Sequence, residues 1–336
     1  MNKIKDKNNF DIVAIGGITE DIMFHTSDLQ IINSPLLSKI PLFAFRPGDK
    51  IISDDKVFYV FGGGGANVAV SLARLGFKTK LIGAIGDDSS GERVRNYLIK
   101  EKIDPALEVI KKYWTGLSFV VTAGRKNEHV IFSHRAANER LLIDEKKLLC
   151  CPAKWFYLTS LSGNQALKNL NTVFHAAALQ AVSIAWNPGS AQLKLPFARL
   201  RGFLKQTNLL ILNKEEAKAL LHSAGIAKDD SLKNLASALA TLGPKMVAIT
   251  DGANGAAILD SVGKYYFAKA TSAKAVNTTG AGDAFGSSLL GGLLLFKGDT
   301  LKALKLGLIR SGLVVKHIGA QVGLNTLSEI KKNYHL

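Results

Sequence analysis

Short apolar runs alternate with longer segments of helical periodicity along most of this chain of 336 residues. The runs end in glycine or in a polar residue, which is typical of buried strands in a parallel sheet. Strands are expected at residues 11–17, 80–85, 155–159, 182–186, 209–212 and 246–250. Helices are expected at residues 66–75, 164–180, 231–242, 282–296 and 300–317. The alternation predicts an α/β fold, a three-layer sandwich in which helices cover both faces of a mainly parallel central sheet.

Local signals mark two helix ends. Gly76 follows the helical pattern at 66–75, and a glycine in this position commonly stops a helix. Ser89 and Glu92 have the spacing of a capping box, which predicts that the next helix opens at Ser89. The strand at 80–85 is therefore expected to lie between two helices.

Two regions interrupt this regular alternation. Residues 22–61 carry prolines and short apolar pieces without a helical period. Residues 115–133 predict a hairpin, with strands at 117–122 and 129–133 and a polar turn at 125–128. We expect one small β-sheet, formed by insertions at about 22–61 and 113–135, that stands off the main body as a lid. A mobile cover over a cleft is a common use of such an insertion. Residues 1–336 are otherwise expected to form a single α/β domain, because no repeat or low-complexity segment divides them.

The composition is that of a globular protein, with 47% hydrophobic and 21% charged residues. The formal net charge of +16 comes from scattered basic residues, which favours a lysine-rich surface that attracts anionic substrates over a nucleic-acid site. Cys150 and Cys151 are adjacent, so they do not staple the fold, and a reducing compartment is expected. The polar first ten residues and the absence of a long apolar run predict a soluble, cytoplasmic protein without a membrane partner.

The segment at 277–285, NTTGAGDAF, contains the most informative chemistry of the chain. Its small residues leave the backbone bare at the start of an apolar helix, where unpaired N–H groups and the helix dipole favour an anion. Asp283 would repel that anion unless it removes a proton beside a phosphate, which is the arrangement needed for phosphoryl transfer to a hydroxyl. A glycine-rich turn whose aspartate only caps the helix would use the same residues.

A second glycine-rich segment, FGGGGAN at 61–67, runs directly into a helix. Glycines allow close approach of a ligand to the backbone, and the Asn67 side chain adds an amide. The segment lacks the Lys-Ser/Thr ending of a Walker loop, and it follows no clean strand of a dinucleotide-binding unit. By itself it would be interpreted as a flexible loop.

Together the two segments resemble the two signatures of the ribokinase-like (PfkB) carbohydrate kinases. The similarity covers nearly the whole chain, from about residue 11 to residue 323, with both signatures in the expected order. The resemblance implies that Asp283 is the base and that the backbone of Gly280, Ala281 and Gly282 forms an anion hole. It further implies that Asp21, just after the first strand, accepts hydrogen bonds from substrate hydroxyls. A turn aspartate is the alternative interpretation of Asp21.

The resemblance also assigns further contacts to the substrate and to the nucleotide. The segments Asn213-Lys214-Glu215-Glu216 and 250–255 (TDGANG) are similar to the elements that organise Mg²⁺ and the nucleotide in this family. Glu216 would hold Mg²⁺ through water in the family arrangement, although acids at a helix start also satisfy the helix dipole. The implied substrate-binding residues are Asp21, Gly63, Gly65, Asn67 and Asn138. The implied nucleotide-binding residues are Asn213, Thr250, Gly252, Gly255 and Asn277.

Three positions near these segments have a simpler interpretation as well. The turn Asn187-Pro188-Gly189 follows a strand and would face the same crevice, but a plain turn explains it better than a ligand contact. Arg135 and Asn138 lie just beyond the hairpin, and solvent-facing polar residues explain them as well as substrate contact does.

The chain departs from the family pattern at two positions. Asn277 stands where many relatives carry an aspartate that helps to bind a monovalent cation, so activation by K⁺ is doubtful. Ser288 stands where glycine or alanine is usual. A serine there would loosen the packing behind the anion hole unless its hydroxyl bonds back to its own helix.

The resulting hypothesis is an ATP-dependent, Mg²⁺-requiring kinase that phosphorylates a hydroxyl of a sugar. A nucleoside acceptor is the main alternative, and phosphosugars come third because they need basic residues such as Arg46 or Arg135 near the acceptor. A sugar-binding sensor without catalysis is the rival of another class, and a nucleic-acid partner is not expected. The apolar stretch at 117–121 predicts a homodimer through the lid.

Overall fold

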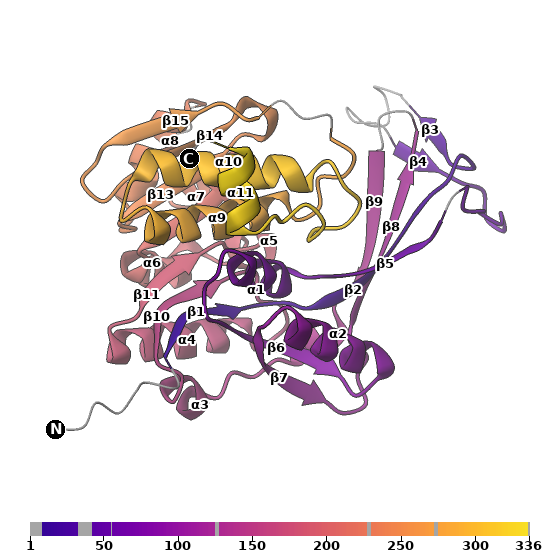
Figure 1. Ribbon diagram of the computed structural model, residues 1–336, viewed down its shortest axis with the longest axis horizontal. Helices are drawn as coiled ribbons and strands as arrows, with labels where there is room; N and C mark the ends of the chain where they lie inside the picture. The colour runs from indigo at the N-terminus through magenta and orange to yellow at the C-terminus, as the bar shows by residue number, and fades with distance from the viewer. Residues whose placement is uncertain are drawn as a thin grey trace.

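The computed structural model describes residues 9–32, 42–54, 56–124, 128–226, 230–271 and 275–334. Within these residues the centre of the molecule is a nine-stranded sheet (Figure 1). In spatial order its strands are β15 (Tyr265–Ala268), β14 (Ala256–Leu259), β13 (Met246–Thr250), β12 (Leu209–Asn213), β11 (Ser183–Trp186), β10 (Ala153–Leu158), β1 (Phe10–Ile15), β6 (Thr79–Gly86) and β7 (Asp104–Ile110). All neighbours from β13 to β7 pair in parallel, whereas β14 and β15 are added antiparallel. The predicted α/β fold with a mainly parallel sheet is confirmed.

Helices cover both faces of this sheet, because successive side chains of a strand point to opposite faces. In β1, Val13 and Ile15 pack into one apolar core, and Ile12 and Ala14 pack into the other. The first core is closed by α3 (Glu145–Leu149), α4 (Ala166–Gln180), α6 (Phe197–Gln206), α7 (Lys214–Ser223) and α8 (Leu232–Ala240). The second is closed by α1 (Gly64–Arg74), α2 (Ser89–Lys100), α9 (Ala281–Leu295) and α10 (Thr300–Val314). The shorter segments are α5 (Ser190–Leu193), α11 (Leu327–Asn333), η1 (Ala136–Arg140) and η2 (Gly252–Asn254).

A second sheet stands to one side of the main body (Figure 1). In spatial order its strands are β5 (Phe58–Gly62), β2 (Thr19–His25), β8 (Gly116–Ala123) and β9 (Glu128–His134). A two-stranded ribbon of β3 (Gln30–Ile32) and β4 (Leu42–Ala44) accompanies it. The predicted hairpin is present as β8 and β9, although residues 125–127 of its turn lie outside the described residues. Because β2 begins at Thr19, Asp21 lies in the lid sheet itself and not in a turn.

Several predicted boundaries need correction. Helix α1 begins at Gly64, two residues before the predicted start, so the last glycines of the second glycine-rich segment are helical. The predicted capping box at Ser89 is wrong: the N-cap is Asp88, whose extended backbone lets Oδ1 accept from the Gly91 N–H at 2.8 Å. Aspartate and serine are both strong N-caps, and only the backbone conformation distinguishes neighbouring candidates.

Three strands of the central sheet have no counterpart among the predicted elements. β7 lies at one edge, contains Pro105 and is partly exposed along its length, and β14 and β15 form a short antiparallel extension at the other edge. β7 and β15 lack the buried apolar run of a central parallel strand, whereas β14 is apolar and buried but only four residues long. Among the described residues, no helix combines the length and the apolar character needed to cross a membrane.

Candidate active site

The carboxyl ends of three neighbouring parallel strands open into one small cavity of about 170 Å³. Strand order explains this, since parallel strands bring the residues that follow them to one edge of the sheet. The first turn of α9 closes the cavity from the opposite side. The residues that line it are Asn187, Ile211, Leu212, Asn213, Glu216, Thr250, Gly280, Gly282 and Asp283. The structure thus brings together residues that the sequence analysis selected from four separate segments.

Asp283 lies in the first turn of α9, whose N-cap is Gly280. Gly280 has a φ of +78°, in the left-handed region that glycine enters without a steric penalty. A Cβ atom at this position would lie 2.3 Å from the Cβ of Ala320, so a larger residue would displace the loop that packs behind it. Ala281 N donates to Thr278 O at 3.2 Å, and Ala284 N is the first N–H of the helix that donates to the carbonyl four residues before it, Gly280 O, at 2.9 Å.

Several polar groups face the Asp283 carboxylate from different elements. Burial raises the pKa of Asp283, and a hydrogen bond from Asn67 Nδ2 to Oδ2 at 2.8 Å opposes that rise by favouring the charged form. Burial, and then the charge of Asp283, raises the pKa of Glu216. The same two causes hold the pKa of the buried Tyr157 hydroxyl well above its usual value. Asp283 and Glu216 therefore meet at one cavity, where a nearby cation would favour the charged forms of both carboxylates.

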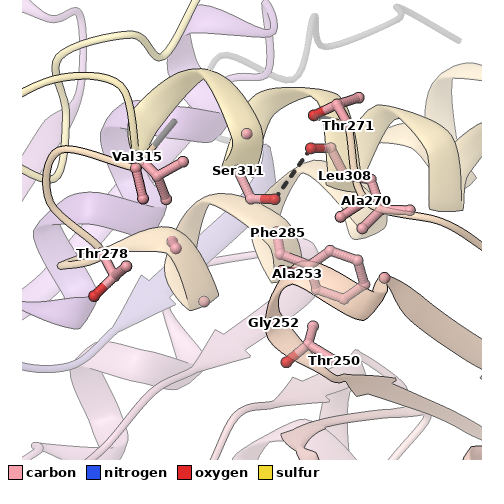
Figure 2. A pocket seen from close by; sticks show the side chains of 15 residues that line it. Thr250, Gly252, Ala253, Ala270, Thr271, Thr278, Phe285, Leu308, Ser311 and Val315 are labelled. Atoms are coloured by element: carbon pink, nitrogen blue, oxygen red, sulfur yellow. Dashed lines mark hydrogen bonds between the residues drawn. The ribbon is translucent and has the colours of Figure 1, made fainter. Parts of the chain in front are cut away.

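A larger cavity of about 560 Å³ adjoins the first, and Thr250 and Gly282 line both (Figure 2). Small and apolar side chains dominate its wall, and its volume is within the range typical of small-molecule sites. The predicted nucleotide residues Gly252 and Gly255 belong to this wall. The remaining lining residues are Ala253, Ala270, Thr271, Ala275, Thr278, Ala281, Phe285, Leu308, Ser311, Gly312 and Val315.

Asn213 and Glu216 form the capping box of α7. Asn213 Oδ1 accepts from Glu216 N at 2.8 Å, and Glu216 Oε2 accepts from Asn213 N at 2.9 Å. Both interpretations of this element are therefore compatible, because the box fixes the helix start and also holds the Glu216 carboxylate against the cavity. Among the described residues no cluster of three or more His, Cys, Asp or Glu side chains is suited to a metal. A single carboxylate fits Mg²⁺, which binds few protein groups and keeps its water.

On the other side of Asp283, the lid strand β2 presents Asp21, which is 5% exposed. Ser118 Oγ on β8 donates a short hydrogen bond to Asp21 Oδ1. Burial raises the pKa of Asp21, and the hydrogen bonds from Ser118 and Thr19 act in the opposite direction. Gly62 on β5 leaves the space that this carboxylate occupies, since a Cβ atom there would lie 2.2 Å from Asp21 Oδ2.

The predicted substrate residues Gly63, Gly65 and Asn67 lie between Asp21 and Asp283. Gly65 N donates to Gly17 O at 3.0 Å, which packs the start of α1 against the end of β1. The Asn67 side chain is 4% exposed and contacts Asp283, as described above. The beginning of α1 therefore connects the lid strands with the first turn of α9.

The polar groups of two further candidates are engaged with the backbone. Asn138 Oδ1 accepts from Ile18 N at 2.9 Å, and its Nδ2 donates to Ile18 O at 2.7 Å. This pair of bonds holds the connection between β1 and β2, two residues before Glu20 and the adjacent Asp21. Asn187 lines the cavity while its Nδ2 donates to Ile211 O at 2.9 Å. Arg135 is exposed and precedes η1.

The structure explains both departures from the family pattern. Asn277 Oδ1 accepts from Thr279 N at 2.7 Å, so the amide supports the turn that leads to Gly280. Ser288 is fully buried, and its hydroxyl accepts from Arg310 Nη1 at 2.9 Å. The bond back to the same helix is made by the neighbouring residue, Ser287, whose Oγ donates to Asp283 O at 2.6 Å. The hydrogen bond between Ser288 and Arg310 joins α9 to α10, so Ser288 does not loosen the packing behind the start of α9.

Three polar residues near the site, two buried and one half-buried, were not selected from the sequence. Arg310 on α10, fully buried, binds Ser71 and Ser288 behind the first turns of α9, and burial lowers its pKa to about 9. Tyr97 and Gln321 contact each other, and Gln321 contacts Asn67. None lies in a recognisable motif, so no local sequence signal would have identified them.

Comparison with known proteins gives a consistent family assignment. The family described as pfkB family carbohydrate kinase matches residues 38–327. Ribokinase of Haemophilus influenzae is 28% identical over 308 residues, which cover 90% of this chain and 95% of that protein. 5-Dehydro-2-deoxygluconokinase of Clostridium perfringens is 27% identical over 340 residues, covering 97% and 93% of the two chains.

A solved structure agrees with these sequence matches. The crystal structure of ribokinase from Cryptococcus neoformans var. grubii serotype A, in complex with ADP, is 25% identical and gives a TM-score of 0.75. The match covers 97% of this chain and 100% of that chain. The chain contains both glycine-rich segments, with Asp283 in the second, and the family match extends over most of its length. The chain therefore belongs to the pfkB family of carbohydrate kinases.

Proposed function

We propose that this ATP-dependent carbohydrate kinase uses Asp283 as the general base for a sugar hydroxyl. The observation that carries the proposal is the position of the Asp283 carboxylate. Asp283 lines the small cavity, which shares Gly282 with the larger, proposed nucleotide cavity. Its carboxylate also accepts a hydrogen bond from Asn67, one of the proposed substrate residues. A base in this position lies between donor and acceptor.

The proposed reaction transfers the terminal phosphoryl group of ATP to the acceptor oxygen. Asp283 takes the hydroxyl proton as the oxygen attacks phosphorus, and the bond between phosphorus and the bridging oxygen of ADP breaks. The backbone N–H groups at the start of α9, at Gly280, Ala281 and Gly282, face the charge of the transferring group. The helix dipole adds to this stabilisation because its positive end lies there.

Glu216 is the proposed contact for Mg²⁺, through water. When bound, the ion offsets the charge of the nucleotide phosphates. Support comes from the charge of the cavity, since Asp283 and Glu216 raise the local negative potential and a divalent cation would relieve it. The proposed nucleotide contacts are Asn213, Thr250, Gly252 and Gly255, which line the two adjoining cavities, and Asn277, which lines a separate cavity under the lid.

The proposed acceptor is a sugar, bound by Asp21 together with Gly63, Gly65 and Asn67. Asp21 is a buried carboxylate on the lid strand β2, and a carboxylate can accept hydrogen bonds from neighbouring hydroxyls of a sugar. For Asn138 we propose an indirect role, since both polar groups of its amide bind Ile18. Phosphosugars are less well supported, because Arg46 and Arg135 are both exposed.

A nucleoside is the second candidate acceptor, and one observation favours it. A cavity of about 400 Å³ lies between the lid and the loops at Val276 and Ile318. Met23 and Thr122 line it, and both belong to the lid-sheet face that carries Asp21, because alternate residues of a strand share a face. A flat apolar group attached to a sugar would fit there.

The lid also supports a proposed homodimer. On the face opposite Asp21, Tyr59, Ile22, Phe119 and Phe132 stand in register across the four strands. Tyr59 is 68% exposed, Phe119 41% and Phe132 52%. An apolar row of this kind is commonly buried against a partner, and a second copy presents the same surface.

ADP release across an acceptor panel tests the proposed function. The panel comprises ribose, fructose, 2-keto-3-deoxygluconate, nucleosides and phosphosugars, each with ATP and Mg²⁺. We expect one free sugar to exceed the nucleosides in kcat/KM by about 100-fold, the discrimination that a few buried hydrogen bonds supply. A nucleoside at the top of the ranking would favour the second candidate. Sugar binding without any ADP release would instead indicate a non-catalytic sensor.

A further inference from the structure

Four side chains that come from four separate elements form a chain of hydrogen bonds that ends on Asp283. Tyr97 on α2 donates its hydroxyl to Gln321 Oε1 at 2.6 Å. Gln321 Nε2, in the segment after α10, donates to Asn67 Oδ1 at 3.0 Å. Asn67 Nδ2 on α1 then donates to Asp283 Oδ2 at 2.8 Å. Gln321 and Asn67 are 5% and 4% exposed, so water has little access to the middle of the chain.

The direction of these bonds determines which group faces Asp283. A side-chain amide can rotate by half a turn and exchange its donor and acceptor ends. The Tyr97 hydroxyl donates to Gln321 Oε1 at 2.6 Å, and burial together with the neighbouring charge of Glu101 raises the pKa of Tyr97 to about 12, which keeps this proton in place. Gln321 must then present its NH₂ group to Asn67. Asn67 must in turn present its NH₂ group, and not its carbonyl oxygen, to Asp283.

The backbone of Gln321 is held by Arg74, independently of the hydrogen-bond chain that ends on Asp283. Arg74 Nη1 donates to Gln321 O at 2.8 Å. The same guanidinium binds Glu101 through two hydrogen bonds, of 2.9 Å from Nε and 2.6 Å from Nη2. An arginine with both a bidentate carboxylate and a backbone acceptor is restricted to one geometry. The anchoring leaves the Gln321 side chain few alternative positions.

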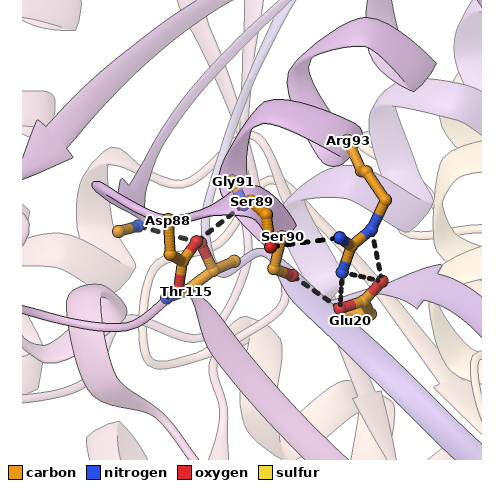
Figure 3. Close-up of polar contacts among 8 residues, drawn as sticks. Glu20, Asp88, Ser89, Ser90, Gly91, Arg93 and Thr115 are labelled. Carbon is orange, nitrogen blue, oxygen red and sulfur yellow. Dashed lines mark hydrogen bonds and ion pairs between the residues drawn. The ribbon is translucent and has the colours of Figure 1, made fainter.

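Helix α2, which carries Tyr97, also holds the lid strand of Asp21 (Figure 3). Glu20, the neighbour of Asp21 on β2, accepts from Ser90 Oγ at 2.7 Å and from both ends of the Arg93 guanidinium. The Tyr97 ring also lies 5.0 Å from the ring of Phe61 on β5. Helix α2 therefore holds the strand that carries Asp21, and it also carries Tyr97, the first residue of the hydrogen-bond chain that ends on Asp283.

We infer that Gln321 is a positioning residue for the catalytic base, acting by fixing the orientation of the Asn67 amide so that its NH₂ group holds the Asp283 carboxylate. Tyr97 supports Gln321 in this role. The inference rests on the proposed role of Asp283 as the base. It adds a requirement that the glycine-rich segments do not contain, because the donor to Asp283 depends on a side chain 254 residues from Asn67 along the sequence.

Gln321→Glu is the first test, because the shape is kept while the donor is lost. When ionised, the introduced carboxylate accepts from the Asn67 NH₂ group, which turns the Asn67 carbonyl oxygen toward Asp283. We expect kcat to fall about 100-fold, as for a base displaced by about 1 Å, with little change in KM for ATP. The acid limb of kcat/KM should move to higher pH, because the Asp283 carboxylate loses the donor that favours its charged form. Glu216 and Tyr157, which also face Asp283, are unchanged in this variant.

Two further variants cover the case in which Gln321→Glu fails to fold or carries a proton. Gln321→Met has no donor in any state, and we expect an approximately 10-fold loss of kcat for one unmade hydrogen bond. Tyr97→Phe keeps the ring contact with Phe61 and removes only the hydroxyl, with an expected loss of about 3- to 10-fold. A merely structural role would lower the melting temperature and leave the pH profile in place.

Gln206→Glu is the matched control, because Gln206 is exposed on α6 and its Nε2 donates to Gly202 O of the same helix. Its kcat and pH profile should match the parent protein. An unchanged kcat and acid limb in Gln321→Glu, or an unchanged acid limb in Tyr97→Phe if the first variant does not fold, would overturn the inference. Asp283→Asn distinguishes the role of Asp283 as the base from the role of Gln321 in positioning it. Full turnover in that variant would refute the role of Asp283 as the base. An inactive Asp283→Asn beside a normal Gln321→Glu would remove only the role of Gln321.

Discussion

Gly62→Ala is a perturbation of the acceptor site by one methyl group. The backbone of Gly62 lies outside the positive-φ region, so alanine is compatible with the strand. The added Cβ would lie 2.2 Å from Asp21 Oδ2, whereas an ordinary contact begins at 3.4 Å. The next nearest atoms are Asp21 Cγ and Thr19 Oγ1, both at 3.1 Å, so only side chains need to move. Asp21 must therefore shift by about 1.2 Å or rotate away from its hydrogen bond with Ser118.

The magnitude follows from the bonds that Asp21 is proposed to make. Hydrogen bonds to a charged group contribute about 1.5–3 kcal/mol each, and each 1.4 kcal/mol corresponds to about a factor of ten in rate. Loss of two such bonds to sugar hydroxyls predicts a fall of at least about 100-fold in kcat/KM for the sugar. The fall should appear mainly as a higher KM for the sugar, because neither the Asp283 side nor the larger cavity contacts Gly62.

The assay is initial ADP release at saturating ATP with varied sugar, followed by varied ATP at saturating sugar. Gly202→Ala is the matched control, since Gly202 lies on the exposed side of α6 and an added Cβ meets nothing within 4 Å. That control should keep both constants and gain slightly in stability from its helix position. A sugar kcat/KM within about three-fold of the parent in folded Gly62→Ala would refute the role of Asp21 in gripping the acceptor.

Three further predictions concern stability, cations and assembly. Arg310→Met leaves the buried acceptors of Arg310 without a donor, so we expect the free energy of unfolding, measured in urea, to fall by about 3 kcal/mol. Arg201→Met, at an exposed position, is the control and should have no effect. Exchange of KCl for NaCl should change turnover by about two-fold at most, because the Asn277 amide is neutral and already bonded; a change of about ten-fold would contradict this. Phe119→Glu should convert a dimer to a monomer in sedimentation, whereas Val262→Glu, 85% exposed away from the lid, should not. A monomeric parent protein would reject the lid dimer.

The central strands and both glycine-rich segments were predictable because their signals are local. β12 and β13 are short apolar runs that end at Asn213 and Thr250, and parallel pairing then places these two residues side by side. Asp283 was selected from the glycine-rich segment at the start of an apolar helix, which is also a local signal. Edge strands were missed because one exposed face or a proline removes the apolar run on which the prediction depends.

The supporting side chains were not predictable for a different reason. Tyr97 and Gln321 are separated by 224 residues, and their role exists only where α2 meets the segment after α10. Isolated polar residues in a sequence are usually solvent-exposed, so a buried pair of this kind gives no local signal. Ser288 shows the same limit, since its partner Arg310 lies on another helix. Local patterns select the proposed reacting groups, whereas tertiary contacts determine which side chains position them.

The most direct measurement is the turnover of Asp283→Asn compared with its nucleotide affinity. The substitution keeps the size of the side chain and an acceptor for the Asn67 NH₂ group, and it removes the buried charge. Because burial raises the pKa of Asp283, loss of the charge should leave the melting temperature unchanged or raise it. The account predicts a fall in kcat of about 100- to 10,000-fold with nearly unchanged ATP binding, as for a lost general base. Turnover near that of the parent protein, with the variant folded and binding ATP, would contradict it.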